Sequence, residues 1–150
     1  MIQIVKDTDT NPLFFLQTAH TTYGIRVMNT GHLEHLYYWE RITVVSQDPS
    51  SCAPLVIQRA FAPGNTCTYD KEHPQISMED VCLEVGTLGK GDIREPFLEV
   101  RFTDGSVTSD FTFDSYEIIT LKEREQCLQD SGLPHSYSEA GTDSAECLKI

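Results

Sequence analysis

The dipeptide Asp104-Gly105, with a run of alternating apolar and polar residues on each side, is the feature that most restricts the fold of this chain. Asp and Gly tolerate the positive backbone angles of a tight hairpin turn, and alternation at a period of two residues is typical of half-buried strands. The sequence therefore predicts an antiparallel hairpin with strands over Pro96–Thr103 and Ser106–Phe113. One face of this hairpin would be apolar and the other solvated.

A second group of strand patterns occupies the first 45 residues. Alternation and β-rich composition predict three or four strands there, over Leu13–Thr18, Thr21–Met28, His32–Trp39 and, as the fourth, Arg41–Val45. The segment Asn29–Gly31 separates two of them, and its Asn and Gly favour a tight turn. These segments indicate a meander of antiparallel strands.

The middle of the chain has weaker signals. Leu55–Ile57 is long enough only for an edge strand, and Ala62–Pro74 contains two prolines and a glycine, which predict a long loop. Such loops in compact domains are usually functional or belong to an interface. Ser77 followed by Asp80 resembles a capping box and predicts one helical turn.

Strand patterns return near the end, at Ser115–Leu121 and Ala145–Ile150, while Lys122–Asp130 suits either a surface turn or a short helix. We therefore expect an all-β chain, an antiparallel β-sandwich with at most one or two short helices, forming a single domain over residues 1–150. The sequence stops directly after its last strand pattern, without a turn, cap or polar tail. We expect it to belong to a longer protein.

The charge of the chain excludes two classes of partner. Lys and Arg number 11 and Asp and Glu number 23, which gives a formal charge of −12. A polyanion repels phosphate backbones and anionic lipids, so we expect no nucleic-acid partner and no membrane partner. No apolar run approaches the ~20 residues of a membrane span, and the first residues lack the pattern of a secretory signal. The expected location is the cytoplasm.

The cysteines are odd in number and widely spaced, and they are Cys52, Cys67, Cys82, Cys127 and Cys147. They form no CxxC pair and no cluster with histidine of the zinc type. We expect five free thiols, as is usual for cytosolic proteins. A disulfide between Cys52 and Cys67 is the alternative.

The sequence contains no clear catalytic, metal or cofactor motif. His32 and His35 are three residues apart, which places them on opposite faces of a strand and disfavours a shared metal ion. Gly86–Gly91 is rich in glycine but lacks the spacing of a phosphate-binding loop and a following helix. The aromatic cluster Tyr37–Trp39 suits core or interface packing better than a sugar platform. We expect no metal and no cofactor.

Five short motifs, in order along the chain, resemble those near the start of glycoside hydrolase family 36 α-galactosidases. They are Gly31–Tyr38 (GHLEHLYY), Gly89–Pro96 (GKGDIREP), Asp104–Phe111 (DGSVTSDF), Tyr116–Ile118 (YEI) and Leu133–Tyr137 (LPHSY). Each motif is weak alone, but their shared order over most of the chain is specific. The chain therefore resembles the N-terminal part of this family.

The resemblance implies a fold and an activity. Members of the family open with a β-supersandwich of the galactose mutarotase type, and a (β/α)8 barrel follows. The barrel carries two catalytic aspartates, a nucleophile and an acid/base, of a retaining mechanism. This chain would then be a non-catalytic part of the supersandwich, inactive by itself, in a parent enzyme that hydrolyses α-galactosides and forms homo-oligomers.

The resemblance also implies a contact with substrate. In the family, a loop of the N-terminal domain reaches a neighbouring subunit's active site, where an aspartate in an LDRAF-like motif contacts galactose. The matching stretch here is Val56–Phe61, so the candidate substrate-binding residues are Gln58 and Arg59. Gln58 replaces the aspartate, and a glutamine keeps the hydrogen-bonding capacity without the charge.

Two other functions remain open at this point. The chain could be a free-standing β-sandwich module that binds carbohydrate or protein without chemistry. It could also be a mutarotase-like epimerase, which would need a placed pair of His and Glu that the sequence does not identify. The natural reading frame distinguishes the parent enzyme from the free-standing module. A βα-repeat pattern after Ile150 supports the enzyme, and a stop codon near Ile150 supports the module.

Overall fold

The computed structural model describes residues 1–6, 11–45, 48–59, 68–89, 94–120, 123 and 146–150. Its strands are β1 (Ile2–Lys6), β2 (Pro12–Gln17), β3 (Thr21–Val27), β4 (Leu33–Glu40), β5 (Glu117–Thr120) and β6 (Glu146–Lys149). Its helices are two short 3-10 segments, η1 (Pro49–Leu55) and η2 (Met78–Asp80). The architecture is antiparallel β with very little helix, as the sequence predicts.

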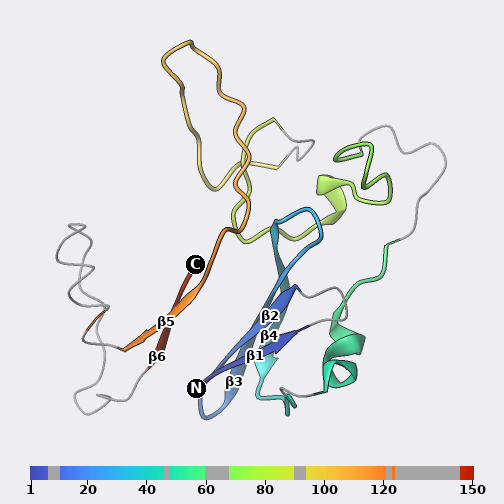
Figure 1. The fold of residues 1–150 in the computed structure, drawn as a ribbon, viewed down its shortest axis with the longest axis vertical. Helices are drawn as coiled ribbons and strands as arrows, with labels where there is room; N and C mark the ends of the chain where they lie inside the picture. The colour runs from blue at the N-terminus through green and yellow to red at the C-terminus, as the bar shows by residue number, and fades with distance from the viewer. Residues whose placement is uncertain (7–10, 46–47, 60–67, 90–93, 121–122, 124–145) are drawn as a thin grey trace.

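The main sheet is an antiparallel meander in the order β1-β2-β3-β4 (Figure 1). The predicted strands at β2, β3 and β4 are confirmed to within one residue at either end. The predicted turn between β3 and β4 is also confirmed, because the Gly31 N–H donates to the Met28 carbonyl at 2.8 Å. Gly31 has a φ of +84°, a backbone conformation that favours glycine.

Two predictions about this sheet were wrong. Strand β1 is absent from the predicted set, yet it pairs along its whole length with β2, Ile4 lying opposite Phe14. The predicted strand Arg41–Val45 is not a strand, because side chains bind its backbone instead of a neighbouring strand. The Ile42 N–H donates to the Thr22 hydroxyl, and the Ile42 carbonyl accepts from the Gln17 amide at 2.8 Å.

The predicted edge strand Leu55–Ile57 is also wrong, because η1 runs through Leu55 and the chain then continues without regular structure. Asp48 caps η1 by accepting the Ser50 N–H at 3.0 Å, which favours a helical turn at this point. The helical turn predicted at Ser77 is confirmed as η2.

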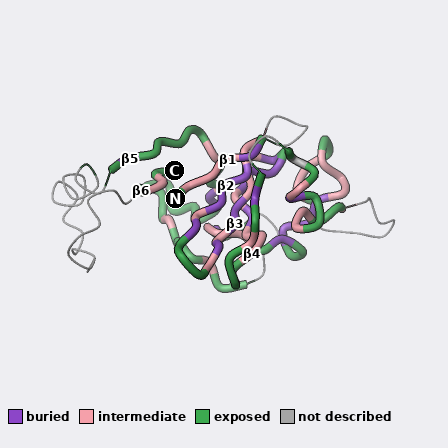
Figure 2. The backbone as a smooth tube through the Cα atoms, turned by 90° about the horizontal axis from the view of Figure 1, so that it is seen from below, coloured by how far each residue is buried: buried purple, intermediate pink, exposed green. Residues whose placement is uncertain are grey.

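The core lies mainly on one face of the meander, under η1 and the segment that leads to it. Its buried members are Val5, Leu13, Phe15, Val44 and Cys52, and the residues packed against them include Leu36, Ile42, Leu55 and Val56. A second cluster lies at one end of the sheet and contains Met28, Ile76, Met78 and Val81. Buried residues accordingly concentrate in β1–β4 in Figure 2.

Residues 94–116 form an extended arm that rises away from the sheet (Figure 1). The predicted Asp104-Gly105 turn is confirmed, since the Phe102 N–H donates to the Ser106 carbonyl at 2.9 Å and Gly105 has a φ of +87°. The predicted strands on either side of it were wrong, because nearly all of the arm is exposed and only Leu98 forms an isolated bridge, with Thr87. Strands need a hydrogen-bonded neighbour, which the described residues do not supply to most of this arm.

The arm leads into the second sheet, where β5 pairs antiparallel with β6. The strands predicted over Ser115–Leu121 and Ala145–Ile150 are confirmed in shorter form. The segment Lys122–Asp130, apart from residue 123, lies outside the described residues, as do residues 62–67 of the predicted loop Ala62–Pro74, whose described part, residues 68–74, contains no helix or strand. Among the helices described, none is long and apolar enough to cross a membrane.

Candidate functional site at Gln58 and Arg59

The candidate residues Gln58 and Arg59 follow η1 and lie beside the end of β3. The Ile57 carbonyl accepts a hydrogen bond from Arg26 Nη2 at 3.3 Å, which ties this segment to the sheet. Gln58 is exposed, whereas the Arg59 side chain is only 11% exposed. The two neighbouring residues therefore face different surroundings.

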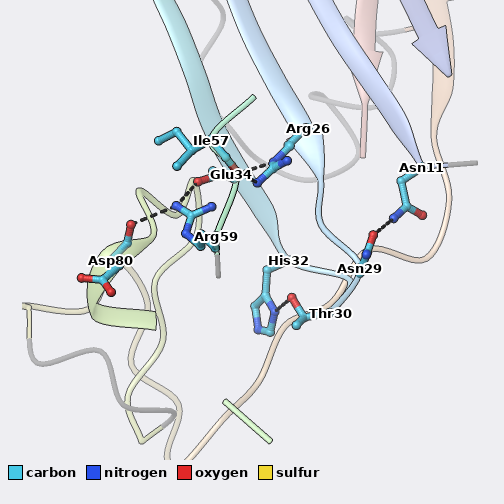
Figure 3. A network of polar contacts seen from close by, with 9 residues as sticks. All are labelled: Asn11, Arg26, Asn29, Thr30, His32, Glu34, Ile57, Arg59 and Asp80. Atoms are coloured by element: carbon cyan, nitrogen blue, oxygen red, sulfur yellow. Dashed lines mark hydrogen bonds and ion pairs between the residues drawn. The ribbon is translucent and has the colours of Figure 1, made fainter. Parts of the chain in front are cut away.

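Arg59 belongs to a buried ionic network centred on Glu34 (Figure 3). Glu34 is 1% exposed, and its two carboxylate oxygens accept from Arg26 Nε and Arg59 Nη2, each at 2.5 Å. Arg59 Nη2 also donates to the Asp80 carbonyl at 3.0 Å. The carboxylate thus joins β3, β4, the segment after η1 and the end of η2.

The sheet register explains why this network forms. Arg26 and Glu34 are direct partners across β3 and β4, so their side chains emerge on the same face. Two guanidinium groups surround one carboxylate, which leaves a surplus of positive charge in a chain of net charge −12. Paired and hydrogen-bonded charges of this kind tolerate burial, whereas a single charge would not.

A pocket of about 160 Å3 opens above this network. Three side-chain amides line it, from Asn29, Gln58 and Gln75, together with both arginines of the network. Apolar residues complete the wall, and they are Val27, Met28, Val56, Ile57 and Ile76. Amides both donate and accept hydrogen bonds, so the pocket suits a neutral polar ligand with an apolar side.

A second polar cluster fastens the arm to the β3–β4 turn. The His32 ring bridges the Thr30 hydroxyl, at 2.9 Å, and Asp110 Oδ1, at 2.8 Å. Tyr69 donates its hydroxyl hydrogen to Asp110 Oδ2 at 2.9 Å. Burial and this hydrogen bond to a carboxylate raise the pKa of Tyr69 to about 12.

A third cluster surrounds Glu84. Its carboxylate accepts from the Tyr23 hydroxyl at 2.5 Å and contacts His35 Nδ1 at 2.9 Å. Burial, followed by the hydrogen bond to Glu84, raises the pKa of Tyr23. His32 and His35 therefore have different carboxylate partners, and each serves to connect a loop to the sheet.

The remaining sequence candidates lie away from this pocket. Trp39 and Tyr38 are 70% and 63% exposed, so these two residues do not pack in the core of this chain, and interface packing, the other possibility predicted for them, stays a prediction. Cys52, Cys82 and Cys147 are free thiols, whereas Cys67 and Cys127 lie outside the described residues. The described residues contain no group of three potential metal ligands.

Comparison with known proteins decides the family. Residues 31–150 match the model of the glycosyl hydrolase family 36 N-terminal domain. The chain belongs to this family. The resemblance inferred from the short motifs is therefore confirmed, and the antiparallel β structure is that of a family 36 N-terminal domain.

Individual relatives agree with this assignment. The chain is 33% identical over 139 residues to the bifunctional alpha-galactosidase/sucrose kinase AgaSK of Mediterraneibacter gnavus. It is 26% identical over 137 residues to the alpha-galactosidase AgaA of Geobacillus stearothermophilus. The crystal structure of the alpha-galactosidase from Lactobacillus brevis matches 77% of the chain with a TM-score of 0.63 and 29% identity.

The family 36 chain is much shorter than these relatives. It is covered over 92% and 91% of its length by AgaSK and AgaA, but it spans only 13% and 17% of theirs. It spans 14% of the Lactobacillus brevis chain. The similarity therefore concerns the N-terminal domain and does not include a catalytic domain.

Proposed function

We propose that this chain is the non-catalytic N-terminal part of a family 36 α-galactosidase. A barrel domain elsewhere in the parent enzyme would hydrolyse terminal α-galactosides by a retaining mechanism. The match of residues 31–150 to the family's N-terminal domain is the observation that carries this proposal. The parent enzyme would act in the cytoplasm, and its domain would be a β-supersandwich of which residues 1–150 form one part.

The exposed arm supports a structural role within a larger assembly. Phe97 is 79% exposed, and Phe102 and Phe111 are 46% and 48% exposed. A large apolar surface of this kind is usual at an interface and costly in water. In our proposal, further strands of the parent domain pair with the arm and cover it, and neighbouring subunits of a homo-oligomer pack nearby.

The pocket at Gln58 supports a second role, contact with the galactoside. The Gln58 side chain is exposed and lines the pocket, so its amide is accessible to a sugar hydroxyl. The Arg59 guanidinium is bound to Glu34 and to the Asp80 carbonyl, and we assign it the task of anchoring the segment from the pocket wall. Gln58 would then reach the mouth of a neighbouring subunit's active site.

The first experiment tests where the chemistry lies. Retaining hydrolysis requires two carboxyl groups about 5 Å apart beside the glycosidic bond. We expect the purified 150-residue chain to release no nitrophenol from nitrophenyl α-galactoside, and the complete enzyme to release it with saturation. Saturable release by the short chain, or inactivity of the complete protein, contradicts the proposal.

The second experiment tests the substrate contact in the complete enzyme. A neutral hydrogen bond contributes about 0.5–1.5 kcal/mol, so Gln58→Ala should raise KM by about two- to tenfold. Gln58→Asp should lower KM, because a carboxylate binds a hydroxyl more strongly. Unchanged KM in both variants would mean that this segment does not touch substrate.

A further inference from the structure

Three residues with amide side chains, from distant parts of the sequence, line the pocket beside the Glu34 network. Asn29 comes from the turn between β3 and β4, Gln58 from the segment after η1, and Gln75 from the loop before η2. Amides on separate loops have no need to converge for folding alone, since each could be solvated. Their convergence on one pocket with a mostly polar lining is the pattern of a small polar ligand site.

The geometry points to Asn29 and Gln75 as further sugar-contact residues that act together with Gln58. This inference rests on the proposed function, because it extends the galactoside contact from one residue to three. A pyranose ring has hydroxyl groups around its edge and a less polar C–H face. The three amides match the hydroxyl groups, and Ile57, the exposed apolar residue of the wall, matches the C–H face.

One atom of the Asn29 amide already has a partner. Its Oδ1 accepts a hydrogen bond from Asn11 Nδ2 at 2.8 Å, which is drawn in Figure 3. With the oxygen directed at Asn11, the Asn29 NH2 group is the part of the amide that can donate to a ligand oxygen. Asn11 does not line the pocket, so it holds the Asn29 side chain by a hydrogen bond from outside the pocket.

The floor of the pocket fixes the relative positions of the three amides. Glu34 holds Arg59, the neighbour of Gln58, and it holds Arg26 on β3, the strand that leads to Asn29. The Asp80 carbonyl, which follows the loop of Gln75, accepts from Arg59 as well. One buried carboxylate thus connects the segments that carry the amides, and this arrangement limits their motion before a ligand binds.

An anion is the rival ligand, because two arginines surround one carboxylate at this place. Three of the arginine donor atoms, Arg26 Nε and Nη2 and Arg59 Nη2, are directed at Glu34 and at the carbonyls of Ile57 and Asp80, while Arg59 Nη1 is buried without a partner among the described residues. The amides carry no charge and line the open part of the pocket. The ligand they fit best is a neutral sugar, and competition by inorganic phosphate distinguishes the two classes.

The experiment measures KM and kcat for nitrophenyl α-galactoside in the complete enzyme with Asn29→Ala and Gln75→Met. Each variant should raise KM by about two- to tenfold, the loss of one neutral hydrogen bond, while kcat stays constant. Asn11→Ala tests the orientation of Asn29, because it removes the Asn11–Asn29 hydrogen bond but leaves the pocket amide, and it should raise KM less than Asn29→Ala does. Gln3→Met is the control for Gln75, because Gln3 is an amide in a different pocket, one lined also by Gln17. Melting temperatures of all four variants show that each one folds.

The outcomes separate this inference from the proposed function. Raised KM in both pocket variants, with unchanged KM in the control Gln3→Met and no competition by inorganic phosphate, supports the inference. If Gln58→Ala raises KM and the Asn29 and Gln75 variants do not, the inference is wrong and the Gln58 contact stands. If none of the three variants changes KM, the galactoside contact itself is refuted. Competitive inhibition by phosphate that Asn29→Ala relieves would make the pocket an anion site and overturn the inference.

Discussion

The four-stranded sheet and the arm of residues 94–116 have equally clear strand patterns, yet only the sheet forms regular strands. In the sheet, Phe15 is fully buried beneath the segment that contains Val44 and Cys52. In the arm, Phe97 is 79% exposed, and the backbone of the arm has few partners among the described residues. Alternation therefore indicates that a segment can be a strand, while a neighbouring strand and a covering layer determine whether it becomes one.

The arm is nevertheless attached firmly at its base. The Phe113 N–H donates to the Gly31 carbonyl at 2.7 Å, and the Thr87 hydroxyl donates to the Ser109 carbonyl at 2.8 Å. Asp110 adds the contact with His32. The sheet and the arm therefore differ most in burial at the tip of the arm. Paired substitutions, one in each region, measure how much this difference in burial contributes to stability.

The largest contrast should come from two phenylalanines. Phe15→Ala removes a fully buried ring from the core and should lower the free energy of unfolding by about 3–5 kcal/mol. Phe97→Ala, at an exposed position, should change it by less than about 0.5 kcal/mol. Urea unfolding followed by circular dichroism gives both values. Comparable losses would show that the arm is as tightly packed as the sheet.

The next contrast concerns ion pairs in the two sheets. Glu34→Ala leaves two arginines without their buried carboxylate and should cost about 3 kcal/mol. Glu117→Ala breaks the exposed pair with Lys149, whose charged atoms are 3.5 Å apart, and should cost less than about 1 kcal/mol. Chemical denaturation at low and high salt measures both costs. If salt weakens the Glu34 contribution as strongly as that of Glu117, the Glu34 network is not buried.

Two glycines with a positive φ, Gly31 near the base of the arm and Gly105 at its tip, allow the packing at these two places to be compared. A Cβ at Gly31 would lie 3.1 Å from Thr112 Cβ, whereas a Cβ at Gly105 would have no neighbour within 4 Å. Both alanine variants carry the cost of a positive φ, about 1–2 kcal/mol. Gly31→Ala should therefore be the more destabilising of the two in thermal unfolding. Equal shifts of the melting temperature would show that Thr112 does not pack against the turn at Gly31.

The smallest effect should appear at alkaline pH. The pKa of Tyr69 is raised from its ordinary value of 10.0 to about 12 in the folded protein, first by burial and then by Asp110. The unfolded chain therefore loses this proton first, so the stabilisation is complete below pH 10 and is lost as the pH rises towards 12. Tyr69→Phe should flatten the decline of stability over this range. The remaining decline reports Tyr23, whose pKa is raised in the same direction, and an unchanged slope would contradict the role of Tyr69.

The sequence predicted the candidate site only through the family resemblance. Gln58 and Arg59 emerged from the LDRAF-like stretch, and no property of the residues alone would have selected them. Glu34 could have been found, because a turn centred on Thr30 places Arg26 opposite it. The convergence of Asn29 and Gln75 could not, since contacts between distant loops leave no local pattern.

The sequence by itself determined the local features of this protein: the meander of β2–β4, the turns at Gly31 and Gly105, and the motifs of the family. These depend on backbone angles and on alternation over a few residues, which each segment carries within itself. Only the tertiary structure decided that Ile42 bonds to the side chains of Thr22 and Gln17, and that Arg59 turns inward to Glu34. Buried donors and charges must be satisfied by whatever partner lies nearest in space, and that partner is set by the packing of the whole chain.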